Sequence, residues 1–315
     1  MGLIILGQPD FAGQIAGRIP NASFLTIEER IFPDGEICPR LVLTNDSQIN
    51  GSHVVIVVQL RTDQNKNDYL ISLLWTIYNI KKYNPARISL IFPYHIYSRQ
   101  DRETRRGEPI SIQYLAETLE SAGINDFLTI NSHIFGKNDI QKIFFHSKAY
   151  DLSAIPILMK GLQNYLSIEG EELICLSPDV GAISLAQAAA TAIKSPYYGA
   201  IHKERDPNTG EVTQTLSKLN LEIKGKNFIV IDDLVSSGST IIGAARLLKQ
   251  HGAKQVYFAY VHAVHSPSNF QKLLAVKPGR IFSTDTIRSN VEGLTIISVI
   301  PLLAEWIQKL SYLMN

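Results

Sequence analysis

Cysteine is scarce in this chain, which has only Cys38 and Cys175 among its 315 residues. The two lie far apart and show none of the short spacings of a metal site, so neither a cysteine metal centre nor a disulfide framework is expected. Disulfides accumulate in oxidising compartments and are rare in reducing ones. The cysteine content therefore favours a reducing, cytoplasmic location.

Long apolar runs and an excess of one charge are also missing. No apolar stretch approaches the roughly 18 residues of a membrane helix. The N-terminal MGLIILG has no basic lead, so it is interpreted as a first strand and not as a signal peptide. Formal net charge is +1, with 45% hydrophobic and 19% charged residues. A globular protein without a nucleic-acid or membrane partner is expected.

What the chain does have is an alternation of short β-rich runs with helical patterns. Apolar residues repeat every three to four positions from Leu70 to Ile80, and a second such helix is predicted from Ser111 to Gly123. A third helix is predicted at 182–193. Continuous apolar strands separated by helices indicate an α/β fold with open, mainly parallel, doubly wound sheets. The predicted strands are 54–60, 88–94, 127–130, 172–177, 228–231, 256–261 and 294–300.

The segment FIVIDDLVSSGSTI, residues 228–241, has the strongest chemical pattern. A predicted strand ends in Asp232 and Asp233, a turn rich in hydroxyls follows, and a helix comes next. Amide groups at a helix N-terminus bind anions, whereas paired carboxylates accept hydrogen bonds from sugar hydroxyls. There is no Gly-Lys-Ser/Thr ending, which excludes a Walker A loop. A cradle for ribose 5-phosphate is predicted, and an Asx-type turn with a serine N-cap is the open alternative. Its residues are Asp232, Asp233, Ser236, Ser237, Gly238, Ser239 and Thr240.

This segment resembles the phosphoribosyl-pyrophosphate motif of two related families, the type I phosphoribosyltransferases and the ribose-phosphate pyrophosphokinases. Ser236 is the residue that archaeal-type pyrophosphokinases carry at its position, and Ser237 keeps the hydroxyl of the usual threonine. Ser239 replaces a glycine of the usual pattern.

Two segments of the N-terminal half favour the pyrophosphokinases. FPDGEI, residues 32–37, is similar to the family segment that reaches from a neighbouring subunit to the adenine of ATP. FPYHIYSRQDRETRRGEPIS, residues 92–111, is similar to its ATP-binding stretch. A tight turn and a solvated charge run are the structural alternatives. The resemblance implies ATP-binding roles for Phe32, Asp34, Glu36, Arg99, Gln100 and Asp101.

Three further segments fall in the family's order. In residues 129–136, His133 matches a metal-linked histidine, although Asn131 stands where the family commonly has aspartate. In residues 177–187, the resemblance implies a pyrophosphate loop of Asp179, Val180 and Gly181, with Asp179 also a metal ligand. A loop histidine and a Pro-Asp turn are the corresponding alternatives.

The third segment, residues 201–214, is similar to the family's catalytic flexible loop. Lys203 and Arg205 match the catalytic residues, whereas Glu204 replaces a common arginine. The alternative is a solvated surface hairpin.

The resemblance implies two similar phosphoribosyltransferase-type domains, each a mainly parallel sheet flanked by helices. Residues 1–148 would form the pyrophosphokinase domain and residues 149–315 the domain for ribose 5-phosphate, with packing of the last helix on the N-terminal domain left as an open alternative. It implies transfer of pyrophosphate from ATP to ribose 5-phosphate, with Mg²⁺, in a homo-oligomer of at least two subunits. A phosphoribosyltransferase and a non-catalytic regulatory homologue remain alternatives, the latter because of Asn131, Glu204 and Ser239.

Overall fold

The computed structural model describes residues 1–135, 139–205, 212–215 and 222–312, with β11 (His202–Arg205) and β12 (Val212–Thr215) described by their backbone alone. The chain forms two compact units. The first contains Met1–Leu152 and the C-terminal segment from Val299, and the second is Ser153–Ser298. Within the described residues, no helix is both long and apolar enough to cross a membrane.

The first unit is built on a seven-stranded sheet in the order β3-β2-β1-β4-β6-β7-β8. Its strands are parallel, except that β3 runs antiparallel to β2. β4 and β7 are buried along their whole length, as expected of strands covered on both faces. The strands are β1 (Leu3–Gly7), β2 (Ala22–Ile31), β3 (Ile37–Leu41), β4 (His53–Val57), β6 (Arg87–Ile91), β7 (Asp126–Ile130) and β8 (Lys148–Leu152), and the helices are α1 (Gln14–Ala16), α2 (Lys66–Lys81), α3 (Ser111–Ala122) and α8 (Ile300–Tyr312).

The division between the units falls after β8, not after residue 148 as expected. β8 pairs with β7 from Lys148 to Leu152, so it completes the first sheet. The last helix, α8, belongs to the same unit, and Trp306 packs edge-on against Tyr150 of β8 with ring centroids 5.2 Å apart. The second unit therefore ends at Ser298 and not at the end of the chain.

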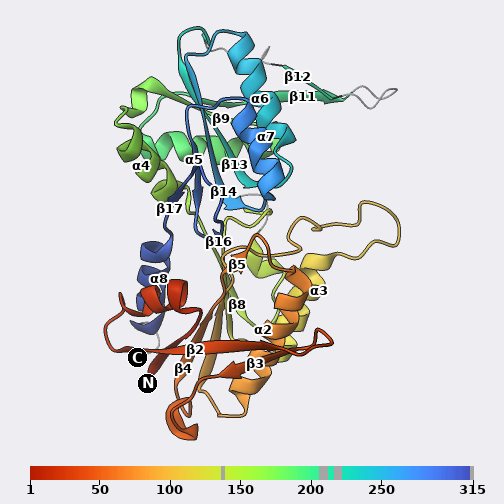
Figure 1. Cartoon of the computed structure of the whole chain (residues 1–315), viewed down its shortest axis with the longest axis vertical. Helices are drawn as coiled ribbons and strands as arrows, with labels where there is room; N and C mark the ends of the chain where they lie inside the picture. The colour runs from red at the N-terminus through yellow and green to blue at the C-terminus, as the bar shows by residue number, and fades with distance from the viewer. Residues whose placement is uncertain (136–138, 206–211, 216–221, 313–315) are drawn as a thin grey trace. The chain divides into compact units, whose positions relative to one another are not determined.

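The second unit contains a six-stranded parallel sheet in the order β10-β9-β13-β14-β15-β17. Both sheets and their covering helices are drawn in Figure 1, and they confirm the predicted α/β class. The strands are β9 (Leu173–Ser177), β10 (Tyr198–Ala200), β13 (Asn227–Val235), β14 (Gln255–Ala263), β15 (Ile281–Thr284) and β17 (Leu294–Ile297), with helices α4 (Ile155–Leu166), α5 (Ile183–Ile193), α6 (Ser239–Gln250) and α7 (Pro267–Ala275). Outside these sheets lie the two-residue strands β5 (Leu60–Arg61) and β16 (Ile287–Arg288).

Gly123 ends α3 as predicted, with a left-handed φ of 113° that favours glycine. At its other end the N-cap residue is Ile110, and the helix begins at Ser111 as predicted.

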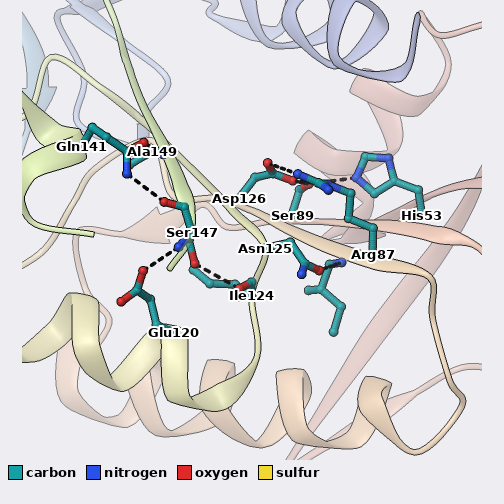
Figure 2. Close-up of polar contacts among 11 residues, drawn as sticks. His53, Arg87, Ser89, Glu120, Ile124, Asn125, Asp126, Gln141, Ser147 and Ala149 are labelled. Atoms are coloured by element: carbon teal, nitrogen blue, oxygen red, sulfur yellow. Dashed lines mark hydrogen bonds and ion pairs between the residues drawn. The ribbon is translucent and has the colours of Figure 1, made fainter. Parts of the chain in front are cut away.

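A buried polar network ties together the amino ends of the strands in the first sheet (Figure 2). Arg87 donates two hydrogen bonds of 2.6 Å to the fully buried carboxylate of Asp126. Ser89 donates its hydroxyl to the same carboxylate at 2.6 Å, so it accepts from His53 Nε2 at 2.8 Å. Burial lowers the pKa of His53 to about 4, and the ring is therefore neutral at pH 7. The network satisfies groups that would be costly to bury alone.

Candidate active site

The predicted ribose-phosphate segment and the predicted pyrophosphate loop follow neighbouring strands of the second unit. β9 and β13 are parallel, with Leu176 opposite Val230. Their carboxyl ends therefore meet at one edge of the sheet, where α5 and α6 begin. Ligands of open α/β sheets bind at this edge.

The strand that carries the acid pair is longer than predicted. β13 continues to Val235, so Asp232 and Asp233 lie inside the strand and not at its end. The reason is the partner strand β14, which pairs Tyr260 with Asp232 and His262 with Leu234.

The two carboxylates are held by backbone amides of the same strand. The N–H of Asp233 donates to Asp232 Oδ1 at 3.0 Å, and the N–H of Leu234 donates to Asp233 Oδ1 at 2.7 Å. The pKa of Asp232 is raised well above its usual range by burial, then by the charge and hydrogen bond of Asp233, and further by the charge of Asp179. The pyrophosphate-loop acid and the acid pair thus interact electrostatically. A cation would relieve this repulsion, and carboxylate oxygens are the ligands that Mg²⁺ prefers.

The helix α6 starts at Ser239, within the hydroxyl-rich segment. Gly238 is the N-cap residue with φ 78°, and a Cβ there would lie 2.7 Å from Leu273 Cδ2. Both facts require glycine. Ser237 Oγ accepts the N–H of Ser239 at 3.4 Å and lies 3.2 Å from Ser239 Oγ. A local hydroxyl turn is therefore present, but the alternative of a serine N-cap is wrong because glycine occupies that position.

The loop after β9 is compact and partly exposed. Asp179 is the N-cap of a 3₁₀ turn, Val180–Ala182, which leads into α5, and its side chain makes no capping hydrogen bond. Ser177 Oγ donates to the Asp179 carbonyl at 2.7 Å and so fixes the loop to the strand end. Val180 is 48% exposed, and Gly181 is exposed as well.

In the first unit, residues 32–36 form the tip of the β2–β3 hairpin. The N–H of Phe32 donates to the Glu36 carbonyl at 2.8 Å, and the N–H of Glu36 donates to Asp34 Oδ1 at 3.1 Å. The ring of Phe32 is 36% exposed, with the Arg30 guanidinium 4.2 Å above its centroid, and Ile31 is 65% exposed. The tight turn of the structural alternative is thus present, and apolar side chains beside it are exposed to solvent.

The predicted ATP-binding stretch follows β6 at the carboxyl edge of the first sheet. The stretch is buried from Phe92 to Ile96. Arg99 is exposed, and Gln100 and Asp101 are half-buried. Gln100 Nε2 donates to Glu108 Oε2 at 3.3 Å, which also accepts the N–H of Arg105 at 3.0 Å. The loop is therefore organised by its own side chains, while residues 102–107 are exposed, as the alternative of a solvated charge run predicts.

His133 follows the adjacent strand β7 at the same edge and is half-buried. The N–H of Ile130 donates to the Pro93 carbonyl at 3.1 Å, which joins this turn to the ATP-type stretch. The other predicted metal ligand, Asp179, belongs to the second unit. In the described part of the chain, no group of three His, Cys, Asp or Glu residues forms a ready metal cage.

Lys203 and Arg205 lie in β11, which pairs antiparallel with β12. Strand alternation puts positions 203 and 205 on one face and Glu204 on the other. The hairpin fits the structural alternative as well as the catalytic prediction, and residues 206–211 of the same segment lie outside the described residues.

Sequence reasoning missed Asp151, which accepts hydrogen bonds from Ser132 next to His133. No sequence signal marks it, because the two residues are 19 positions apart. Two cavities of the second unit, of about 520 and 680 Å³, lie away from this edge, around Lys226 and Lys160 respectively.

Comparison with known proteins accounts for both units. Residues 4–123 match the family described as the N-terminal domain of ribose phosphate pyrophosphokinase, and residues 152–275 match the phosphoribosyl transferase domain. A ribose-phosphate pyrophosphokinase from Saccharolobus solfataricus is 31% identical over 305 residues, covering 94% of this chain and 97% of the relative. One from Oceanobacillus iheyensis is 32% identical over 304 residues, covering 94% and 89%.

A solved structure agrees with these relatives over nearly the whole chain. The crystal structure of phosphoribosylpyrophosphate synthetase from Mycobacterium smegmatis superimposes with a TM-score of 0.84 and 26% sequence identity. The match covers 98% of this chain and 99% of that one.

Proposed function

The chain belongs to the ribose-phosphate pyrophosphokinase family, a family of diphosphate-transferring enzymes, and we propose that it makes 5-phosphoribosyl 1-pyrophosphate and AMP from ATP and ribose 5-phosphate. The C1 hydroxyl oxygen of the sugar attacks the β-phosphorus of ATP. The bond from that phosphorus to the α,β-bridging oxygen breaks, AMP leaves with the electron pair of that bond, and the proton of the C1 hydroxyl is released. Such transfers depend on positioning and charge stabilisation. The observation that supports this proposal most directly is the acid pair followed by the hydroxyl turn. It lies in a chain of which 98% is covered by the match to a phosphoribosylpyrophosphate synthetase structure.

The sugar would bind at the carboxyl edge of β13. Hydroxyls of Ser237, Ser239 and Thr240 would donate to the 5-phosphate, where the N-terminus of α6 favours negative charge. Ser236 and Gly238 complete this turn, and Asp232 and Asp233 would accept hydrogen bonds from the ring hydroxyls. The exposed positions of Ser237 and Ser239 support this assignment, because a phosphate can reach both.

Mg²⁺ fits the acids of this edge. In the second unit, Asp179 would hold metal and the pair Asp232 and Asp233 offers further oxygens; in the first unit, His133 would be a metal ligand. When bound, the ion would neutralise charge on the transferred phosphates. Val180 and Gly181 would present the loop after β9 to the pyrophosphate.

ATP would bind to the first unit through Arg99, Gln100 and Asp101. The hairpin residues Phe32, Asp34 and Glu36 would contact the adenine of the ATP that is bound to a neighbouring subunit. This arrangement requires at least a homodimer. The exposed aromatic ring at the hairpin tip supports this, because an apolar tip of this kind suits contact with another molecule. Lys203 and Arg205 would stabilise the charge of the transferred group. A cytoplasmic location remains a prediction.

The test is formation of AMP from ATP that depends on ribose 5-phosphate and Mg²⁺. A phosphoribosyltransferase would instead release pyrophosphate from phosphoribosyl pyrophosphate when a nucleobase is added, without ATP. A non-catalytic homologue would do neither. Of these three functions, only the proposed one requires both units. The phosphoribosyltransferase alternative needs the second unit only, because the match to the phosphoribosyl transferase domain lies there.

Replacing Ser237 by alanine is expected to raise KM for ribose 5-phosphate about 10- to 100-fold and to change KM for ATP little. The variant removes one hydroxyl donor to a charged acceptor, a contact of about 1.5–3 kcal/mol. Thr240→Val should act in the same direction. Steady-state kinetics with each substrate varied in turn give both constants.

Ser268→Ala is the matched control. Ser268 is exposed in the first turn of α7 and lies 3.0 Å from another serine hydroxyl, as Ser237 does at α6. It should leave both constants unchanged. An equal rise of both KM values in Ser237→Ala would refute the 5-phosphate assignment.

Subunit mixing tests the shared adenine site. A Phe32→Ala, Glu36→Ala double variant and an Arg99→Ala variant are each expected to be inactive, because each damages every adenine site of its own oligomer. Mixed and reassembled, they should regain up to about a quarter of wild-type activity, because random pairing restores some intact sites. Exchange demonstrated by mass spectrometry without recovered activity would reject the shared site.

A further inference from the structure

The turn that precedes His133 is held by an acid on the neighbouring strand. Ser132 donates its backbone N–H to both carboxylate oxygens of Asp151 at 3.2 Å and its hydroxyl to Oδ2 at 2.5 Å. The N–H of Asn131 donates to the Leu152 carbonyl at 2.9 Å. Two successive residues before His133 are thus anchored to the end of β8.

The backbone of this turn needs such anchoring. Asn131 is fully buried and has a φ of 40°, in the left-handed region that residues other than glycine rarely adopt. A conformation of this kind persists only where the surroundings determine it. The hydrogen bonds from residues 131 and 132 to the end of β8 supply that constraint.

Asp151 has no other described role in the fold. Burial raises its pKa to about 6, against the hydrogen bonds from Ser132, which lower it. Among the side chains that the structure describes, no lysine or arginine forms an ion pair with it. A carboxylate is costly to bury without a charged partner. Its described hydrogen bonds all come from the turn of His133.

The strand that leads into this turn contacts the ATP-type stretch. Besides the bond from Ile130, Thr129 Oγ1 donates to the Pro93 carbonyl at 3.3 Å. The end of β7, from which the His133 turn continues, is thus bonded to the start of the segment that leads to Arg99.

We propose that Asp151 and Ser132 are positioning residues that hold the His133 turn in place for ATP and its metal ion. This inference rests on the proposed function. Neither residue touches the reacting atoms, and their effect passes through the backbone of residues 131–133. Partners of this kind typically change activity or metal affinity by about 10- to 100-fold when removed.

Ser132→Ala is the test, because it removes the hydroxyl and keeps the backbone donor. We expect kcat/KM for ATP to fall about 10- to 100-fold, whereas KM for ribose 5-phosphate stays within about twofold, since its predicted groups lie in the second unit. Ser132→Thr keeps a hydroxyl and should recover most of the loss. Asp151→Asn should give the same kinetic pattern, and it serves as the test if Ser132→Ala does not fold.

Ser147→Ala is the matched control. Ser147 is 3% exposed against 2% for Ser132, and its hydroxyl donates to the Ile124 carbonyl at 3.0 Å, at the amino edge of the same sheet (Figure 2). It should lower the melting temperature by about as much as Ser132→Ala and leave the kinetics unchanged. A purely structural role of Ser132 would make the two variants alike, which would overturn the proposal.

A readout without catalysis separates this inference from the proposed function. The imidazole resonance of His133, in protein labelled with ¹³C-histidine, can be assigned by its loss in His133→Gln. It should shift in Ser132→Ala and Asp151→Asn but not in Ser147→Ala. If the wild type forms no AMP, the proposed function fails while this spectrum still tests the positioning role. An unshifted resonance in both variants would contradict it.

Discussion

Lys203→Ala is expected to lower kcat by about 10²–10³-fold, the usual effect of removing one preorganised charge donor from a transition state. Arg205→Ala should be at least as severe, because arginine clamps on phosphoryl groups contribute about 10³–10⁵. Both KM values should change little, since these cations would meet the phosphates only when charge shifts onto the bridging oxygen. Rapid-quench and steady-state measurements of AMP formation give the chemical step and the KM values.

Glu204→Ala is the control within the same strand. Alternation in β11 puts position 204 on the face opposite to 203 and 205, so this variant should be mild. If Lys203→Ala and Glu204→Ala had equal effects, or if Lys203→Ala mainly raised KM for ATP, this hairpin would not be the catalytic segment.

The second large effect is on stability. Asp126→Asn is expected to reduce the free energy of unfolding by about 3 kcal/mol, the lower end of the range for breaking a buried ion pair. The substitution removes the charge and leaves one accepting oxygen, which cannot serve both Arg87 nitrogens and the Ser89 hydroxyl. The Arg87 side chain is 26% exposed and so can be partly rehydrated. Urea denaturation followed by circular dichroism measures it.

Glu305→Gln breaks an ion pair of similar length at the surface and is the matched control. Its bond to Lys309 is 2.7 Å long, but the two side chains are 63% and 70% exposed. Exposed pairs of this type contribute about 0.3–0.5 kcal/mol. A loss in Asp126→Asn no larger than in Glu305→Gln would show that the network in Figure 2 does not stabilise the first sheet.

The sequence was sufficient for the α/β class because buried parallel strands appear as short apolar runs. The sequence did not predict strand bounds correctly where pairing with a neighbouring strand extends a strand beyond its apolar residues. Aspartate is disfavoured in strands, so the pattern ended β13 before Asp232, yet its ladder with β14 extends to Val235. In the same way, β8 has little apolar alternation, so its membership of the first sheet and the boundary after Leu152 were not visible.

The candidate site likewise contains residues that the sequence predicts and residues that it does not. Turn residues whose chemistry is local, such as Gly238 with its positive φ, are readable from the sequence. Asp151 acts through a partner 19 residues away, which only the pairing of β7 with β8 brings near. The resemblance places Lys203 in a flexible loop and the polar segment RDPNTGE fits one, whereas the backbone of residues 202–205 pairs with β12.

The most direct measurement of the central claim is a ³¹P NMR spectrum of the wild-type chain with ATP, ribose 5-phosphate and Mg²⁺. The account predicts AMP and a new diphosphate attached to the sugar C1, formed in equal amounts, with no signal of ADP. Omission of ribose 5-phosphate should abolish both products. ADP as the nucleotide product, or no product under conditions where the protein is folded, would contradict it.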